Sequence, residues 1–317
     1  MEKRKNLNTM NSIKTLLVVF ISCLTVESRC QSIQIQLDQY MTDVRNATRS
    51  VNLNELFKNE NAIAVLDAVQ IYYEDSLSRV RARAYELTKQ VGIKSDKLEA
   101  RQLAANRLAS CHRDSNAGNL GQLWSLLTKF RIEDFTVEAK DSLKSAFRNK
   151  PAHLDQLMKL MGYLEMSDMK EEIRAFTLPP NSKRDRWAAL LALSRMGDDE
   201  AIQSVMQRSQ KLKVNDDVVY EVFPDLIYTR QAAPINYLIT VLNSDDKNCY
   251  AADGESETRI PCAYRAMEQL APVIEGYPVR LDASGDVVAS NYEKALADVR
   301  KWFAKNGQSY KIRKAVF

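Results

Sequence analysis

The chain has few residues that interrupt helices, with 9 glycines and 8 prolines among 317 residues. An all-β protein needs turn residues about every 10 positions, and this sequence does not supply them. Long stretches are instead rich in Ala, Leu, Glu, Lys, Arg and Gln, which lose little side-chain freedom on a helix. The sequence therefore predicts an all-α fold.

Residues with catalytic or metal-binding chemistry are also scarce. The two histidines, His112 and His153, belong to separate helical segments, without a carboxylate or thiol at metal-ligand spacing. The sequence contains no glycine-rich phosphate loop and no Gly-x-Ser-x-Gly motif. Ser167 and Lys170 match the Ser-x-x-Lys pattern of an activated nucleophile, but the companion motifs are missing and Ser167 fits a helix cap. We expect no catalytic residues, no metal site and no cofactor.

The amino terminus predicts an export signal. A short apolar run at residues 16–24 follows four basic residues. The run is shorter than the roughly 20 residues that span a bilayer, and it is typical of a signal peptide. The basic residues are Lys3, Arg4, Lys5 and Lys14.

Residues 1–30 are therefore predicted as a signal peptide or a lipoprotein leader, and the processing site stays open. Ser28 and Cys30 are small residues that permit cleavage before Gln31. Alternatively, residues 20–23 resemble a bacterial lipobox that would make Cys23 the lipidated first residue, and an uncleaved anchor is a third reading. We expect an extracytoplasmic protein, periplasmic or secreted, that touches a membrane only through such a lipid anchor.

The positive charge of the chain comes mostly from this leader. The full sequence has 45 basic and 41 acidic residues, and removal of residues 1–30 leaves 40 and 39. A nucleic-acid-binding surface needs a clear basic surplus. We therefore expect no nucleic-acid partner.

Three cysteines lie beyond the leader. Cys249 and Cys262 flank a polar loop, and a disulfide between them would add about 3 kcal/mol in the loop-entropy model. Export makes a disulfide permissible, although two separate, partly buried thiols are the alternative. Cys111 lies beside His112 and is predicted to be an unpaired thiol near a helix end.

From residue 61 onward, apolar residues recur at spacings of three and four, which predicts a series of amphipathic helices. We divide the chain into an irregular segment at 31–60, a helical region at 61–178, a more regular helical region at 182–306 and a tail at 307–317. Pro179 and Pro180 lie at the expected boundary between the two helical regions. The predicted helices are 61–91, 95–111, 120–130, 135–148, 151–164, 167–176, 184–196, 200–212, 217–227, 234–242, 263–274 and 291–305.

One segment resembles a known repeat. Residues 186–198 read Arg-Trp-Ala-Ala-Leu-Leu-Ala-Leu-Ser-Arg-Met-Gly-Asp. This segment resembles the first helix and turn of a HEAT repeat, although the usual proline within the helix is absent. Helix pairs that start near 184, 217 and 261 are 33 and 44 residues apart, which brackets the usual repeat of about 40–47.

The resemblance implies an armadillo-type fold of the bacterial cell envelope, in which antiparallel helix pairs stack into a right-handed HEAT-like α-solenoid. Such proteins usually bind a protein or peptide on a concave helical face. We therefore expect a non-catalytic extracytoplasmic interaction scaffold. The alternative is a secreted all-α enzyme that acts on envelope glycans through paired carboxylates.

Arg184, Arg186 and Trp187 are the candidates for a binding patch, because bases and an aromatic residue lie close together in the sequence. The competing interpretation places Trp187 in the core and leaves the arginines solvated or paired with the acidic turn at residues 198–199.

Overall fold

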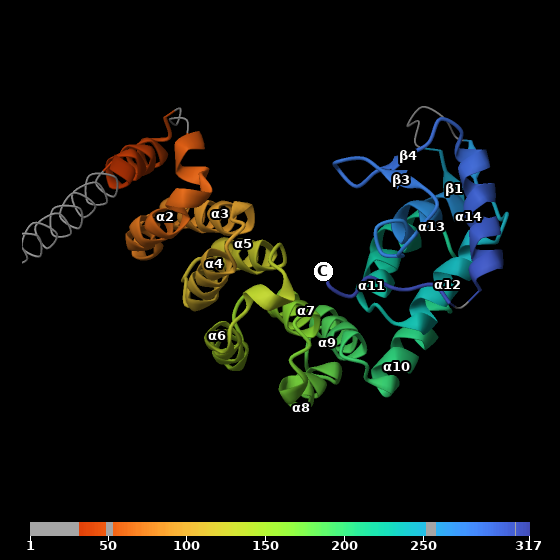
Figure 1. Ribbon diagram of the computed structural model, residues 1–317. Coiled ribbons are helices and arrows are strands. Elements are labelled where there is room, and N and C mark those ends of the chain that lie inside the picture. The colour runs from red at the N-terminus through yellow and green to blue at the C-terminus, as the bar shows by residue number, and fades with distance from the viewer. Residues whose placement is uncertain (1–31, 49–52, 252–257, 308) are drawn as a thin grey trace, which may run out of the picture. The chain divides into compact units, whose positions relative to one another are not determined.

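The computed structural model describes residues 32–48, 53–251, 258–307 and 309–317 (Figure 1). The described chain is mostly helical, with four two-residue strands, so the predicted all-α class is confirmed. The predicted leader, including Cys23 and Cys30, lies outside the described residues. Within the described ranges, no helix combines the length and the apolar character that crossing a membrane requires.

The chain forms two compact units, which divide between Ser142 and Leu143 inside helix α6. The Pro179–Pro180 pair, where the sequence suggests a boundary, lies within the second unit. We describe each unit by itself.

The first unit consists of helices joined by short turns. Residues 32–46 form a helix where the sequence predicts an irregular segment. The predicted helix at 61–91 is interrupted, because a 3-10 turn and the Ser76–Leu77 bend separate α2 from α3. The named α-helices are α2 (Ala62–Val69), α3 (Ser78–Lys94), α4 (Leu98–Ser110), α5 (Ala117–Leu127) and α6 (Val137–Arg148), and the 3-10 turns are Asn54–Phe57, Asn59–Asn61, Gln70–Glu74 and Ile132–Asp134.

Small residues let α3 and α4 approach closely. A Cβ on Gly92 would lie 2.5 Å from the Ala104 Cβ, so glycine is needed where the two helices meet. The inner face of α4 carries Ala100, Ala104 and Leu108, all fully buried. Trp124 of α5 is 1% exposed and is the largest side chain in the core of this unit.

Three turns of the first unit begin the next helix in the same way. The side chains of Asp75, Ser95 and Asp114 each accept a hydrogen bond from the backbone N–H two residues later, at 2.9, 3.2 and 2.8 Å. A helix starts three residues after each of them, at Ser78, Leu98 and Ala117. Such side-chain caps satisfy backbone donors that would otherwise be unpaired.

The second unit contains shorter helices and two small hairpins. Strands β1 (Cys249–Tyr250) and β2 (Arg259–Ile260) pair antiparallel, as do β3 (Arg280–Leu281) and β4 (Val287–Val288). The helices are α7 (Leu154–Tyr163), α8 (Lys170–Arg174), α9 (Lys183–Arg195), α10 (Asp199–Ser209), α11 (Phe223–Tyr228), α12 (Ala232–Leu242), α13 (Ala263–Leu270) and α14 (Tyr292–Asn306), with 3-10 turns Ser167–Met169 and Ala175–Thr177 and a π-helical turn Val218–Val222.

The loop between β1 and β2 is closed by a disulfide between Cys249 and Cys262, the first of the two alternatives that the sequence leaves open. The two Cα atoms are 5.1 Å apart. Both cysteines are buried, at 0% and 3% exposure. The disulfide therefore fastens the hairpin to the start of α13.

Helices α7 and α9 pack through Gly162. A Cβ on Gly162 would lie 2.7 Å from the Ala192 Cα and would also overlap the Tyr228 hydroxyl. The hydroxyl itself donates a hydrogen bond of 2.5 Å to the carbonyl oxygen of Lys159, so it is not free to move aside. The absent side chain therefore sets the distance between the two helices.

Substitution Gly162→Ala is expected to lower the free energy of unfolding by about 1–2 kcal/mol. Overpacking costs about 1–3 kcal/mol and outweighs the gain of about 1 kcal/mol from alanine in a helix. The measurement is urea unfolding followed by circular dichroism. Gly118→Ala is the control, because a Cβ there would meet only the Asn116 Oδ1 within 4 Å, at 3.1 Å. Equal stability of both variants would contradict close packing at Gly162.

Candidate functional site

A large hollow of the first unit lies beside the starts of α3 and α5. Its volume is about 820 Å³, and Tyr73, Asp75, Arg81, Tyr85 and Asp114 are among the residues that line it. Both charges and aromatic rings therefore face this hollow. Its chemistry depends on how these groups are paired.

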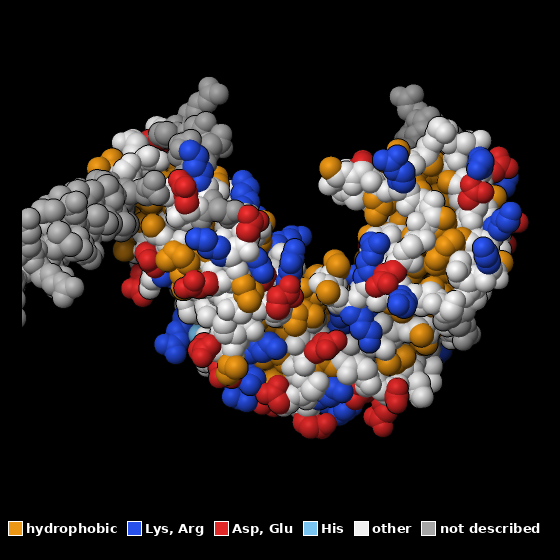
Figure 2. Space-filling model, in the orientation of Figure 1, with side chains coloured by type: hydrophobic (Ala, Val, Ile, Leu, Met, Phe, Trp, Pro, Cys, Tyr) orange, Lys and Arg blue, Asp and Glu red, His pale blue; other side chains and the backbone are white. Residues whose placement is uncertain are grey.

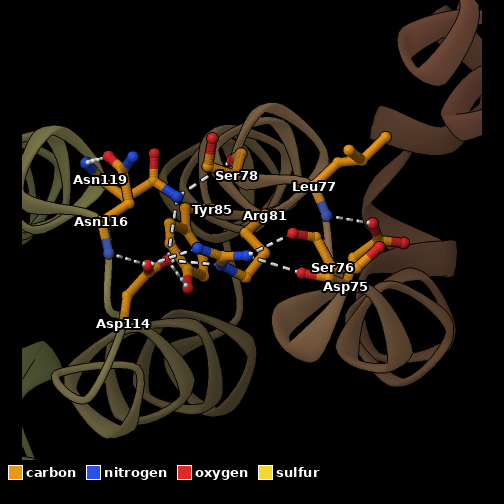
Figure 3. Close-up of polar contacts among 9 residues, drawn as sticks. All are labelled: Asp75, Ser76, Leu77, Ser78, Arg81, Tyr85, Asp114, Asn116 and Asn119. Atoms are coloured by element: carbon orange, nitrogen blue, oxygen red, sulfur yellow. Dashed lines mark hydrogen bonds and ion pairs between the residues drawn. The ribbon is translucent and has the colours of Figure 1, made fainter.

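Asp114 is the centre of the polar network at the hollow (Figure 3). Its carboxylate accepts hydrogen bonds from Arg81 Nε and Nη2 at 2.8 and 2.7 Å. Tyr85 Oη and Asn119 Nδ2 donate to the same carboxylate at 2.8 and 2.9 Å. The Asp114 side chain has no solvent exposure, and that of Arg81 is 12% exposed.

Arg81 connects this carboxylate to the turn that precedes its own helix. Its Nη1 donates to the carbonyl oxygens of Asp75 and Ser76 at 2.7 and 3.3 Å. Figure 3 shows the guanidinium between Asp114 on one side and these two residues on the other. The network therefore ties the start of α3 to the turn before α5.

Asp114 keeps its negative charge at any ordinary pH. Burial alone would raise its pKa, but hydrogen bonds from Arg81, the Asn116 N–H, Asn119 and Tyr85 together lower the pKa to about 2. A general acid needs a pKa raised towards the working pH. Asp114 is therefore suited to holding Arg81 in place and not to donating a proton.

A second pair in the same unit repeats this arrangement. Arg101 Nε donates to Asp134 Oδ1 at 2.8 Å, and its Nη1 donates to the Ser95 and Asp96 carbonyl oxygens at 3.3 and 3.2 Å. Each arginine lies 33 residues before its aspartate and six residues after the first of its two carbonyl partners. The Arg81–Asp114 pair is therefore a recurring feature of the fold.

Cys111 also lines the hollow. Burial raises the pKa of its thiol to about 12, and its Sγ donates to the Arg107 carbonyl oxygen at 3.2 Å. His112, its neighbour, makes a ring-nitrogen contact of 3.1 Å with the Ala109 carbonyl oxygen. A thiol that stays protonated at neutral pH is a weak nucleophile. Cys111 is the unpaired helix-end cysteine that the sequence predicts.

The candidate patch Arg184, Arg186 and Trp187 has two separate sets of partners in the second unit. Arg184 is exposed and pairs with Asp155 at 2.7 Å. The Trp187 indole N–H donates to Asp225 Oδ2 at 2.6 Å, and Arg186 is half-buried. The acidic turn at 198–199 pairs with Arg174 instead, at 2.7 Å from Asp198 Oδ2. The three candidates therefore do not converge on one described site.

Ser167 of the Ser-x-x-Lys pattern makes a local contact in a turn. The Ser167 hydroxyl donates to the Glu165 carbonyl oxygen at 3.3 Å, at the start of the 3-10 turn that leads into α8. His153 adopts a left-handed backbone conformation at the start of α7, with φ of 58°. In the part of the chain that the structure describes, no three His, Cys, Asp or Glu side chains gather as metal ligands.

Two buried arginines of the second unit, Arg195 and Arg230, were not predicted from the sequence. Each is 4% exposed. Arg195 Nη1 donates to the Tyr228 carbonyl oxygen at 2.6 Å, which links α9 to α11, and Arg230 Nη1 donates to the Ile227 carbonyl oxygen at 2.5 Å. The burial of Arg195 could have been predicted from spacing, because Arg195 follows the buried Leu191 by four residues and therefore lies on the same face of α9.

Burial sets the electrostatics of this arginine pair. Burial and the neighbouring charge of Arg195 lower the pKa of Arg230 to about 10, and burial lowers the pKa of Arg195. The Arg195 guanidinium lies 5.6 Å from the ring centres of both Tyr163 and Tyr228. Cation–π contacts of this kind favour the charged form where water is excluded. Two positive charges therefore lie close together beneath the surface.

Comparison with known proteins adds no relative. No protein-family model, curated protein or solved structure matches the chain.

Proposed function

We propose that the chain is a non-catalytic, extracytoplasmic protein-interaction scaffold built from stacked antiparallel helix pairs of the HEAT type. The observation that supports the proposal best is the repeated arginine–aspartate pair of the first unit. Arg81 and Arg101 lie at the same position in two successive helices. Arg81 joins α3 to Asp114 in the turn before α5, and Arg101 joins α4 to Asp134 in the turn before α6. A contact repeated in this way is typical of a modular stack.

The helix starts support the same interpretation. Ser78 and Ala117 are 39 residues apart, and so are Leu98 and Val137. This interval is close to the roughly 40–47 residues of HEAT-type pairs. We propose a right-handed solenoid arrangement within this unit as well, so that the proposed pairs begin earlier in the chain than residue 182.

The surface composition and the disulfide are compatible with this role. Figure 2 shows Lys and Arg interspersed with Asp and Glu on the described face of each unit. A buried disulfide is typical of oxidising compartments, which supports an extracytoplasmic location. We propose that the leader exports the chain. Lipidation of Cys23 would anchor the protein to a membrane, whereas cleavage near Gln31 would release it. We propose that a protein or peptide binds along a concave helical face.

Site-specific photo-crosslinking of the full chain tests the scaffold. A photoreactive residue replaces Ile71 or Val137, which are 64% and 71% exposed, in the cells that make the protein. We expect the exposed positions to give discrete heavier adducts with the same partner in repeated experiments. A photoreactive residue in place of the exposed Leu178 on the second unit is the matched comparison, and it separates binding by the first unit from binding by the second.

Two outcomes would count against the scaffold. One is the absence of a reproducible adduct from every exposed position. The other is release of soluble fragments when the purified chain is incubated with envelope glycan, which would favour the enzyme with paired carboxylates.

A further inference from the structure

The last residues of the chain lie on the second unit as a non-helical segment beside α11 (Figure 1). Ile312 forms an antiparallel bridge with Ile274. Backbone hydrogen bonds of 2.9 Å join Glu275 N to the Lys311 oxygen and Arg313 N to the Val273 oxygen. The segment therefore adds to the second unit in the manner of a short β-strand.

The two buried arginines bind the main-chain oxygens of this segment. Arg195 Nη2 donates to the oxygens of Lys314 and Val316 at 2.5 and 3.0 Å. Arg230 donates to Arg313 at 3.0 Å through Nε, and to Val316 and Phe317 at 3.4 and 3.3 Å through Nη2.

Tyr163 Oη donates to the remaining oxygen of this run, that of Ala315, at 3.2 Å. Every main-chain oxygen from Arg313 to Phe317 is therefore bound by a buried side chain. Because these contacts are to main-chain atoms, they do not depend on which side chains the segment carries.

The side chains of the segment are mostly exposed, whereas the residues beneath them are buried. Residues 313–316 are exposed, with Val316 at 51%. Tyr163 and Tyr228 below are 1% and 4% exposed. The segment therefore covers Tyr163 and Tyr228 while most of its own side chains stay in contact with solvent.

Phe317 is the aromatic anchor of the segment. Its ring centre lies 5.4 Å from that of Tyr163 and 5.3 Å from that of Tyr228. Edge and tilted aromatic contacts at these distances add to the apolar gain of burial. The surface therefore contacts one side chain of the segment, Phe317, together with the main-chain oxygens of residues 313–317.

Charge makes the chain's own segment a poor match for this surface. Arg195 and Arg230 bind the neutral main-chain oxygens of the segment, whose exposed side chains include the bases Lys311, Arg313 and Lys314. An acidic segment would be attracted to the two buried arginine charges more strongly than a basic one. The bound segment is therefore one that a better-matched peptide can displace.

We propose that Tyr163, Arg195, Tyr228 and Arg230 form a peptide-binding groove that residues 311–317 occupy intramolecularly, and that an extended acidic peptide with an aromatic side chain at the Phe317 position displaces them. The inference rests on the proposed interaction function and names the chemistry of the partner. A folded protein domain would not fit, because the groove binds consecutive main-chain oxygens of an extended chain.

Fluorescence anisotropy with two labelled peptides tests the groove. One probe is the peptide of residues 309–317, and the other carries Lys311→Glu, Arg313→Glu and Lys314→Glu; both are amidated so that only the side chains differ. We expect the acidic peptide to bind at least about 10-fold more tightly at low salt. The Phe317→Ala full chain, whose own segment is held less firmly, should bind it at least about 10-fold more tightly than the wild type.

Val316→Ala is the matched control in the same segment, because Val316 is exposed, and it should bind as the wild type does. The proposal is overturned when a folded Phe317→Ala chain shows no saturable binding of either peptide. Equal binding by the wild type and Phe317→Ala also overturns it, since the peptide would then occupy another surface.

Hydrogen exchange of the wild-type chain supplies a second readout that needs no substitution. The Arg313 amide, bonded to Val273, should exchange at least about 10-fold faster when the acidic peptide is saturating. Exchange of that amide only through global unfolding overturns the proposal. Peptide binding without a cellular crosslink would contradict only the proposed scaffold function. A crosslink without peptide binding would contradict only the proposed peptide-binding groove.

Discussion

Replacing Asp114 by asparagine is expected to lower the free energy of unfolding of the first unit by about 3 kcal/mol at pH 7. Removal of one partner from a buried ion pair costs about 3–5 kcal/mol, because the other charge is left uncompensated. The lower end applies because the Arg81 side chain is 12% exposed and keeps some contact with water. Hydrogen exchange of peptides from α3 to α5 measures the effect in this unit separately from the second.

The pH dependence of this effect has a definite sign. The pKa of Asp114 is lowered in the folded chain from 3.8 to about 2. A lowered pKa stabilises the folded state above the unfolded value, and the stabilisation is lost as the pH falls through the folded value. The difference between the wild type and Asp114→Asn should therefore be constant near neutral pH and shrink between pH 3.8 and about 2.

Two further substitutions give this prediction its controls. Asp134→Asn should have a similar effect, because its side chain is 2% exposed and pairs with Arg101 in the same way. Glu99→Gln removes an exposed charge from the first turn of α4 and should change stability by less than about 1 kcal/mol. A loss for Asp114→Asn no larger than that for Glu99→Gln would show that the network does not hold the helices together.

Removal of the disulfide by Cys249→Ala and Cys262→Ala together is expected to lower the free energy of unfolding by about 3 kcal/mol. The bond joins residues 13 positions apart, and closing a loop of this size removes that much conformational freedom from the unfolded chain. Both cysteines are buried, so the hairpin loses its attachment to the start of α13.

Reductant separates this effect from a packing defect. Dithiothreitol should lower the melting temperature of the wild type and leave the double variant unchanged. Cys111→Ala is the control, because Cys111 is unpaired and the variant should keep the response to reductant. A wild-type melting temperature that does not respond to reductant would contradict the disulfide.

Much of the helical structure was predictable because helix formation depends on local spacing. The stripes at three and four residues and the few glycines and prolines give the all-α class, and the acidic or serine caps mark the helix starts. The same local signal misled at residues 61–91, because apolar residues continue at helical spacing through the 3-10 turn Gln70–Glu74. The helix at 32–46 carried a usable stripe of buried Ile33, Leu37 and Met41 that the prediction of an irregular segment overlooked.

The pairing of charges and the burial of arginines were decided only by the tertiary structure. Nothing local distinguishes Asp114 from the other turn aspartates, since its partner lies 33 residues away on a helix that stacks beside it. Arg195 and Arg230 are buried because the chain returns more than 80 residues later to offer main-chain oxygens. Spacing along a sequence determines which face of a helix is apolar, whereas the partner of a buried charge depends on which distant elements that face is packed against.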